Sequence, residues 1–296
     1  MAAMGIKPEG YIGYSCGEIM CAYCDGAFDA REALLVSKIY GECIQSVNIA
    51  RGLMFAIGLS WNEVKAILPA DLYIACNNSP NNVTIGGPSE TVEEFVSELR
   101  RKGVKTWPVN SCGFAPHSHS FSRSKGLLLS CLERVITAPI PRSPKWVSTS
   151  LHEEDAPEFS FYGQNTPLYY FNNLESPVLF HEAVGKIPSN SVVIEIGLSG
   201  MLQTVLRDSL PADCQCLSLG KGKKNKEVEA SGNEVVRLMT NIGDIFNAGV
   251  PVDFSHLYVP DKFPTSSMCP PLATDFQWES ANAWKEFGTK KVSPNG

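Results

Sequence analysis

The stretch Gly13-Tyr14-Ser15-Cys16-Gly17 most constrains what this chain can fold into, because it fits the pattern G-x-S-x-G. An apolar run at 10–14 precedes it and a helix-like pattern at 16–25 follows it. A tight strand-to-helix turn holds such a serine in a strained backbone conformation, and the flanking glycines avoid clashes. The N–H of Cys16 can then face a developing oxyanion at the helix N-terminus. The sequence therefore favours a nucleophile elbow at Ser15; the alternative is a glycine-rich turn with a buried capping serine.

A serine nucleophile needs a general base, and the chain has five histidines. His117 and His119 lie in GFAPHSHSF, a turn that leaves a predicted strand, as is typical of site loops. The other three fall in a helical stretch, a polar loop and the C-terminal region. Both are candidate bases, and the alternative for either one is an exposed turn histidine.

Composition bounds the class of protein. The chain has 296 residues and is 44% hydrophobic, which is enough for one large or two modest domains with a real core. A net charge of −6 argues against a general polyanion binder, and no run approaches the ~18 apolar residues of a membrane span. The first ten residues do not form a signal peptide, so we read the ten cysteines as reduced thiols and expect a cytoplasmic protein.

Alternating strand and helix patterns predict a layered α/β core. In the segment 29–48, apolar residues follow a helical period, and Asp29 with Glu32 predicts a capping box at its start. From residue 169 we expect an extended piece and then a helix. The other core strands are expected at 10–14, 146–150, 191–197 and 214–219, and the other helices at 16–25, 125–136, 176–187, 200–210 and 227–248.

The segment 53–109 predicts a second unit. Its patterns run strand, helix, strand, strand, helix, strand, which is the order of a ferredoxin-like unit. Ser60 and Ser89 are the expected caps of its two helices. The strands are expected at 53–59, 72–76, 82–86 and 104–109, and the helices at 60–68 and 89–103.

Metal-ligand patterns are weak in this sequence. Cys21 and Cys24 lie one turn apart on a predicted helix, but no second pair completes a ligand set. We therefore predict buried thiols at both positions and no metal.

Longer runs resemble the malonyl/acetyl acyltransferase domain of animal-type, or type I, fatty acid synthase. GYSCGEIMCAYCDGAFDAREALL resembles the family's GHSLGE…AYADG segment, and the match continues through GLSWNEVKAILP, ACNNSPNNVTIGGP, PRSPKWVSTS and NNLESPVLFHEAV. PLATDFQWESANAW resembles the linker that follows the domain. The resemblance implies an α/β-hydrolase-like acyltransferase core at 1–52 and 113–250, an inserted ferredoxin-like subdomain at 53–112 and a post-acyltransferase linker at 251–296. It also implies an N-terminal truncation of the core.

The resemblance carries an activity with it. Ser15 would take an acyl group from acyl-CoA and pass it to the phosphopantetheine thiol of an acyl carrier domain, with His117 as base and the Cys16 amide in the oxyanion hole. Asn172 and Asn173 match an asparagine-bearing stretch near the family's pocket. The implied partners are acyl-CoA, an acyl carrier domain and other synthase domains, with no nucleic acid, no membrane and no permanently bound cofactor.

Several positions depart from the family pattern. Tyr14 stands where the family has a histidine, and Pro116 stands where an aromatic residue is usual. Tyr40 replaces the arginine that pairs with the malonyl carboxylate, and Lys38 faces elsewhere on the helix. Leu198-Ser199 replaces a proline-histidine pair. These changes predict a reshaped pocket and poor use of malonyl donors. Two alternatives stay open, namely a catalytically degenerate interaction module of the synthase and a serine esterase or thioesterase, which a buried aspartate orienting His117 would favour.

Overall fold

The structure is a computed structural model that describes residues 1–46, 51–151, 163–197, 200–220 and 234–257. The chain divides into two units, residues 1–252 and 253–296. The second unit is described only at its start, which contains the short 3₁₀ helix η4 (Phe254–Leu257). The predicted linker at 251–296 therefore lies mostly outside the described residues.

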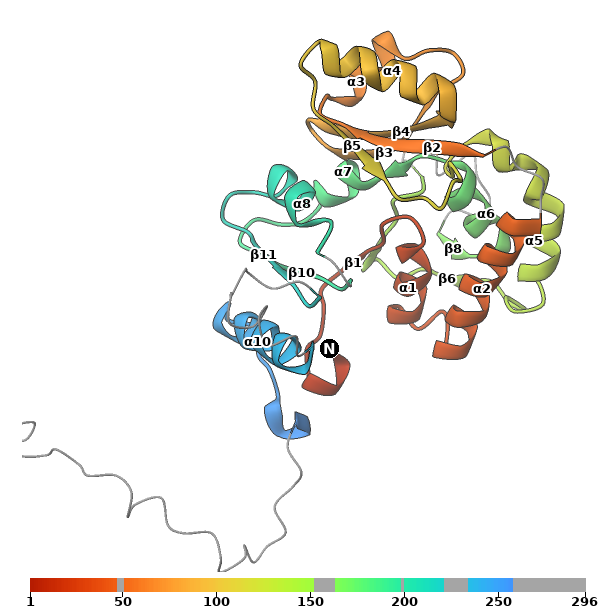
Figure 1. Cartoon of the computed structure of the whole chain (residues 1–296). Coiled ribbons are helices and arrows are strands. Elements are labelled where there is room, and N and C mark those ends of the chain that lie inside the picture. The colour runs from red at the N-terminus through yellow and green to blue at the C-terminus, as the bar shows by residue number, and fades with distance from the viewer. Residues whose placement is uncertain (47–50, 152–162, 198–199, 221–233, 258–296) are drawn as a thin grey trace, which may run out of the picture. The chain divides into compact units, whose positions relative to one another are not determined.

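The predicted ferredoxin-like topology is present. Four antiparallel strands have the order β5-β2-β4-β3, and a fifth strand, β9 (Val178–Leu179), pairs in parallel with β3 at the edge (Figure 1). The added strand was not predicted. The other elements are β2 (Gly52–Ile57), α3 (Trp61–Ile67), β3 (Tyr73–Ser79), β4 (Asn82–Pro88), α4 (Ser89–Arg101) and β5 (Thr106–Val109).

Alternation along the strands builds two cores on this sheet. Ile57 and Ile74 belong to the cluster that includes Val64 of α3 and Phe95 of α4, the helices that cover one face (Figure 1). Neighbouring strand residues such as Ala75 point the other way and join a cluster with residues of α7 (Phe180–Val184) and α8 (Gln203–Ser209). The sheet is therefore buried on both faces.

Helix starts test the capping predictions. Ser60 is the predicted cap and also forms a capping box with Glu63, which was not predicted. Asp29 forms the predicted capping box with Glu32 through bonds of 2.8 and 2.7 Å. The prediction for Ser89 is wrong: Pro88 occupies the N-cap, so Ser89 is already the first helical residue and its hydroxyl caps nothing.

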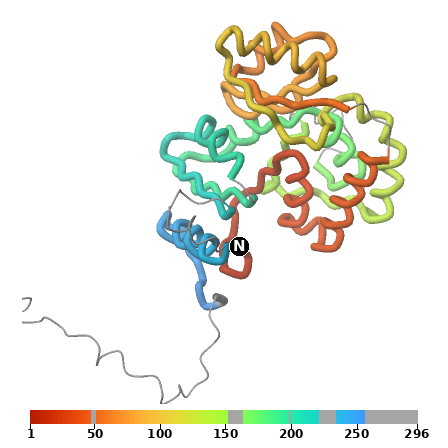
Figure 2. Tube along the Cα trace, in the orientation of Figure 1, coloured from red at the N-terminus to blue at the C-terminus, as the bar shows by residue number. Residues whose placement is uncertain are grey.

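Four helices enclose a further buried core, separate from the two on the sheet. They are α1 (Gly17–Cys24), α2 (Ala30–Ser46), α5 (Lys125–Leu132) and α6 (Pro167–Glu175), which follow one another around a single buried cluster (Figures 1 and 2). The aromatic side chains of Tyr169, Tyr170 and Phe121 lie at its centre, with 0% exposure each. The 3₁₀ helices η1 (Ala2–Met4) and η2 (His119–Ser124) complete the described helices together with α10 (Glu234–Asn247).

The predicted layered sheet of the core takes the form of separate short parallel pairs. β1 (Tyr11–Ile12) pairs with β7 (Trp146–Val147), and β10 (Val192–Glu195) pairs with β11 (Gln215–Ser218). The strand predicted to be buried at 191–197 is half-buried along β10, and Ile196 after it is 68% exposed. A two-stranded sheet cannot bury both faces as a wide one does. The antiparallel pair β6 (Ile140–Pro141) and β8 (Gln164–Asn165) is a further short ladder.

The prediction for 169–187 is wrong in detail. The expected extended piece is helix α6, because Thr166 caps it through the N–H of Tyr169 and Pro167 occupies its first turn. The helix expected from 176 begins only at Phe180, because Val178 and Leu179 pair with β3 instead. This rearrangement places Asn172 and Asn173 on a helix. No helix in the described ranges is long and apolar enough to cross a membrane.

Candidate active site

Ser15 lies in the sharp turn between β1 and α1, as predicted. Its φ of 55° is in the left-handed region that a residue with a Cβ rarely adopts. A Cβ on Gly13 would lie 2.4 Å from the backbone nitrogen of Glu18, so only glycine fits beside the first turn of α1. Gly17 has open space around it and no positive φ, so the predicted steric need for a second glycine is not found.

His117 meets the serine from a loop 102 residues further along the chain. The Ser15 hydroxyl and His117 Nε2 are 2.8 Å apart, within normal hydrogen-bond range. The histidine also has a positive φ, 64°, and its backbone N–H donates to the backbone carbonyl of Leu174 at 2.8 Å. Its side chain is almost fully buried. The structure therefore brings together the two residues that the sequence nominated.

Two backbone carbonyls fix the protonation of this imidazole. His117 Nδ1 lies 2.9 Å from the carbonyl oxygen of Asn173 and 3.0 Å from that of Ser176. A carbonyl can only accept, so Nδ1 carries the proton and Nε2 is the free base that accepts from Ser15. Burial lowers the pKa of His117 to about 4, and the two carbonyls partly oppose that shift. At neutral pH the imidazole is uncharged and ready to take a proton.

Asn173 holds both members of the pair. Its side-chain amide donates to the backbone carbonyl of Ser15 at 3.2 Å and to the hydroxyl of Ser150 at 2.8 Å. The backbone carbonyl of Asn173 accepts from His117 Nδ1. Asn172 points elsewhere: it donates to the Ser150 carbonyl at 2.7 Å and accepts from the Ser176 hydroxyl at 2.9 Å. Of the two predicted asparagines, Asn173 touches the pair directly and Asn172 supports the residues around it.

Cys16 is exposed and is the N-cap residue of α1. The next two amides, of Gly17 and Glu18, donate back to the carbonyls of Tyr14 and Ser15. Within the described ranges, the Cys16 N–H donates to no protein acceptor. This amide is thus available beside the serine for an external oxyanion.

Tyr14 points away from the Ser15–His117 contact. Its hydroxyl donates to Asn78 Oδ1 at 2.8 Å, and its ring packs edge-on against Phe180 at 5.2 Å. Asn78 donates onward to Asn82 and Thr84 of β4. Tyr14 therefore ties the elbow to the ferredoxin-like sheet.

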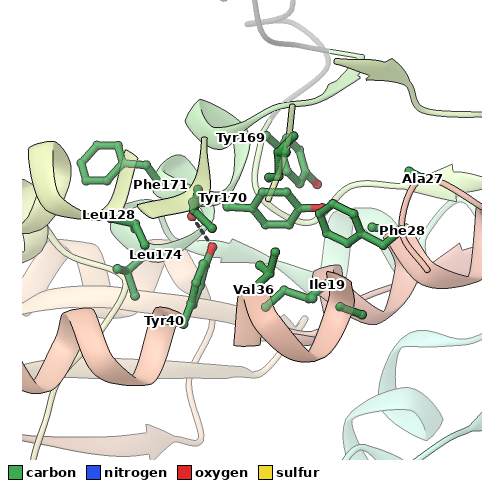
Figure 3. Close-up of a cluster of buried hydrophobic side chains, with 14 of the residues drawn as sticks. Ile19, Ala27, Phe28, Val36, Tyr40, Leu128, Tyr169, Tyr170, Phe171 and Leu174 are labelled. Carbon is green, nitrogen blue, oxygen red and sulfur yellow. Dashed lines mark hydrogen bonds between the residues drawn. The ribbon is translucent and has the colours of Figure 1, made fainter. Parts of the chain in front are cut away.

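Tyr40 is a core residue. Its hydroxyl donates to the backbone carbonyl of Tyr170, and its ring meets that of Tyr170 edge-on, beside Val36 (Figure 3). Burial raises its pKa well above the usual tyrosine range. Lys38 lies outside this core in an exposed ion pair with Glu42, as the helical spacing predicted. A tyrosine carries no positive charge, so position 40 itself supplies no cation.

Other predicted positions are less informative. Pro116 is half-buried directly before His117, and His119 is exposed and contacts Glu175. Leu198-Ser199 lies outside the described residues. Cys21 is buried as predicted, but Cys24 is exposed because it ends α1. No cluster of candidate metal ligands occurs in the part of the chain that the structure describes.

Sequence reasoning missed the buried acid behind the elbow. Glu18 has no exposed surface and accepts from Trp146 Nε1 at 2.6 Å, the Tyr169 hydroxyl at 2.7 Å and the Thr149 N–H at 2.6 Å. One signal was available: Glu18 shares the inner face of α1 with Ala22, where a charged residue is out of place.

Comparisons with known proteins agree on one family. A family model described as "Acyl transferase domain" matches residues 1–250. The highly reducing polyketide synthase lcsB of Purpureocillium lilacinum is 29% identical over 309 residues, which span 100% of this chain and 12% of that protein. The highly reducing polyketide synthase ntnH of Nectria sp is 30% identical over 310 residues, with 96% of this chain and 12% of that protein covered. The chain thus spans about an eighth of the length of these curated relatives.

Solved structures show the same fold. The acyltransferase domain from module 8 of the salinomycin polyketide synthase superposes with a TM-score of 0.69 at 21% identity, covering 86% of this chain and 58% of that one. The predicted fold class, an α/β acyltransferase core with an inserted ferredoxin-like subdomain, is confirmed.

Proposed function

The chain belongs to the acyl transferase domain family, and from that premise we propose that it moves an acyl group from acyl-CoA, through an ester on Ser15, to the phosphopantetheine thiol of an acyl carrier domain. The observation that carries the proposal is the 2.8 Å contact between Ser15 Oγ and the unprotonated Nε2 of His117. A serine next to a base that is itself oriented by a third group is the arrangement of nucleophilic catalysis.

The chemistry follows from this geometry. Ser15 Oγ attacks the thioester carbonyl carbon while His117 Nε2 takes the hydroxyl proton. The oxyanion that forms can accept from the Cys16 N–H. The carbon–sulfur bond then breaks, His117 returns the proton to the departing thiolate, and the acyl group remains on Ser15. The carrier thiol reverses these steps, giving its proton to His117 as the new thioester forms and the Ser15 ester breaks.

The contacts around Ser15 and His117 bear on the two alternatives to acyl transfer, a degenerate interaction module and a serine esterase or thioesterase. A degenerate interaction module would have no reason to keep a strained serine, a buried base and Asn173 in contact with both. A buried aspartate on Nδ1 would have favoured an esterase or thioesterase, whereas the carbonyls of Asn173 and Ser176 occupy that position. Both observations favour acyl transfer.

The donor class follows from Tyr40. A malonyl carboxylate buried without a cation loses about 3–5 kcal/mol relative to a paired one, which is a selectivity factor of roughly 10² or more. Tyr40 offers no charge, and its hydroxyl is already engaged by Tyr170. Neutral donors such as acetyl-CoA or a medium-chain acyl-CoA meet no such penalty. We therefore expect the domain to prefer neutral acyl groups.

Two kinds of multienzyme that share this acyl-transfer step are candidates for the parent enzyme. The sequence motifs resemble fatty acid synthase, whereas the relatives reported above are polyketide synthases. Both kinds of multienzyme would supply the carrier domain as partner, with the core at 1–52 and 113–250 and the subdomain at 53–112 acting as one acyl-loading unit.

The test is the intact mass of the protein after brief incubation with acetyl-CoA, malonyl-CoA or a medium-chain acyl-CoA. We expect a single acyl adduct from the neutral donors, a weak one from malonyl-CoA, and none in Ser15→Ala. Ser120→Ala, which changes an exposed serine of η2, is the matched control and should load normally. Pantetheine added afterwards should remove the adduct as a thioester.

Each other outcome has a meaning. Folded protein that loads no donor would favour the interaction module. Loading followed by rapid release as free acid, with no pantetheine thioester, would favour the esterase. Strong loading by malonyl-CoA would refute the interpretation of Tyr40.

A further inference from the structure

Behind the elbow, Glu18 has no surface exposed to solvent and no ion pair within the described residues. It lies in the first turn of α1, three residues after Ser15. Its Oε2 accepts from Trp146 and Tyr169, and its Oε1 accepts from the Thr149 N–H. The Thr149 hydroxyl lies 2.8 Å from Oε1 and 2.7 Å from the carbonyl oxygen of Gly13.

The protons in this group can be counted. A threonine hydroxyl has one proton, so Thr149 can donate to Gly13 or to Glu18 but not to both. If Glu18 is ionised, Thr149 leaves one of these two contacts without a proton, whichever acceptor it chooses. That contact, with the Gly13 carbonyl oxygen or with Glu18 Oε1, is then repulsive. If Oε1 carries a proton, it donates to Thr149, Thr149 donates to the Gly13 carbonyl, and every contact is satisfied.

We propose that Glu18 is a positioning residue that is held as the neutral acid. It donates its proton to the Thr149 hydroxyl, which in turn donates to the Gly13 carbonyl. This chain of hydrogen bonds fixes Gly13 and with it the Ser15 elbow. Gly13 follows β1 directly, two residues before Ser15, and the glycine backbone there approaches Glu18 itself closely. The role in catalysis rests on the proposed function of Ser15, whereas the protonation of Glu18 does not.

The groups around Glu18 act on its protonation in both directions. Full burial raises the pKa of Glu18, while the donors from Tyr169, Thr149 and Trp146 oppose that rise. The guanidinium of Arg142 lies over the rings of Trp146 and Tyr169, at 5.2 and 4.9 Å from their centroids, and it is the one nearby cation of the described contacts. The titratable neighbours Cys21, Tyr40, Tyr169 and Tyr170 all have raised pKa values and are uncharged at neutral pH.

The first measurement is ¹³C NMR of the whole chain labelled at the glutamate carboxyl carbons. At pH 7 we expect one signal at the position of a protonated carboxyl, and this signal should vanish in Glu18→Gln. A spectrum with only ionised glutamates at pH 7 would overturn the proposal. This readout needs no acyl donor and no variant that folds, because the wild-type spectrum alone can contradict it.

The second measurement is the rate at which a fluorophosphonate labels Ser15, with loss of fluoride. We expect labelling to be ~10-fold slower in Thr149→Val, because a displaced nucleophile loses its alignment, and to be largely recovered in Thr149→Ser. Thr240→Val, at an exposed position of α10, is the matched control and should label like wild type. Equal rates for Thr149→Val and wild type would overturn the positioning role. A wild-type protein that is not labelled at Ser15 would instead count against the proposed function, and the NMR result would still stand.

Discussion

The Ser15–His117 pair and the core around Tyr40 differ in the kind of contacts that hold them. Around the pair, polar contacts between 2.8 and 3.2 Å hold the hydroxyl, the imidazole and the turn. Around Tyr40 the neighbours are apolar or aromatic, and the one polar atom of its ring is engaged by a backbone carbonyl (Figure 3). The first region is organised for proton transfer, whereas the second offers shape and no charge.

The comparison separates how the domain reacts from what it accepts. Burial acts on both regions, but it leaves His117 neutral with Nε2 free to accept a proton, while it leaves Tyr40 neutral with its hydroxyl already bonded. A change in the first region should therefore alter the rate with every donor. A change in the second should alter stability or the choice of donor and leave proton transfer alone.

Removing the base should have the largest effect. His117→Ala should slow acylation of Ser15 by about 10²–10⁴-fold with every donor, because the hydroxyl loses the group that takes its proton. Single-turnover acylation, followed by intact mass on protein with native circular dichroism, measures this. His119→Ala removes the exposed neighbour and should acylate at the wild-type rate; equal losses in the two variants would contradict the assignment of His117.

Removing the Asn173 side chain should have the next effect. Asn173→Ala deletes the donors to the Ser15 carbonyl and the Ser150 hydroxyl but keeps the backbone carbonyl that orients His117. We expect about 10–10²-fold slower acylation, as is usual when a nucleophile is misplaced but its base remains. The same assay measures it, with Asn62→Ala at an exposed position of α3 as control. A rate unchanged from wild type would show that the turn needs no support from α6.

The pH dependence should report the burial of His117. Its pKa is lowered from 6.5 to about 4, so the base stays deprotonated well below neutral pH. We expect the acylation rate to stay level as the pH falls from 8 to about 5, and then to drop tenfold per unit below about 4. Rates are compared only over the pH range in which circular dichroism remains native. A decline centred near 6.5 would mean that the imidazole is solvated.

The parts of this site that were predictable are those fixed by local chemistry. The strand, glycine and serine pattern predicted an elbow at Ser15, and a serine nucleophile needs a base, which left His117 and His119 as the candidates. The resemblance to the acyltransferase family then selected His117, which lies 102 residues from Ser15. The βαββαβ order of the subdomain was predictable for a similar reason, because each strand and helix shows its own period.

The parts that were missed depend on tertiary contacts. The aromatic stretch before Asn172 looked extended, yet Tyr169 and Tyr170 belong to a helix whose buried face no local pattern could reveal. The role of Asn173 depends on two segments meeting it from distant parts of the chain. Ser89 failed as a cap because the helix begins one residue earlier than the serine suggested, a typical uncertainty at helix ends.

The smallest effect should come from the second region. Tyr40→Phe keeps the ring but removes the hydroxyl that donates to Tyr170, which leaves a buried carbonyl without this donor. The free energy of unfolding should fall by about 1–3 kcal/mol, as measured by urea denaturation, while Tyr23→Phe on the exposed face of α1 should change it little. The ratio of acetyl to malonyl loading should not move, because neither tyrosine nor phenylalanine supplies a cation. A variant that shifts this ratio without losing stability would show that the Tyr40 hydroxyl contacts the donor, and the separation between the two regions would then fail.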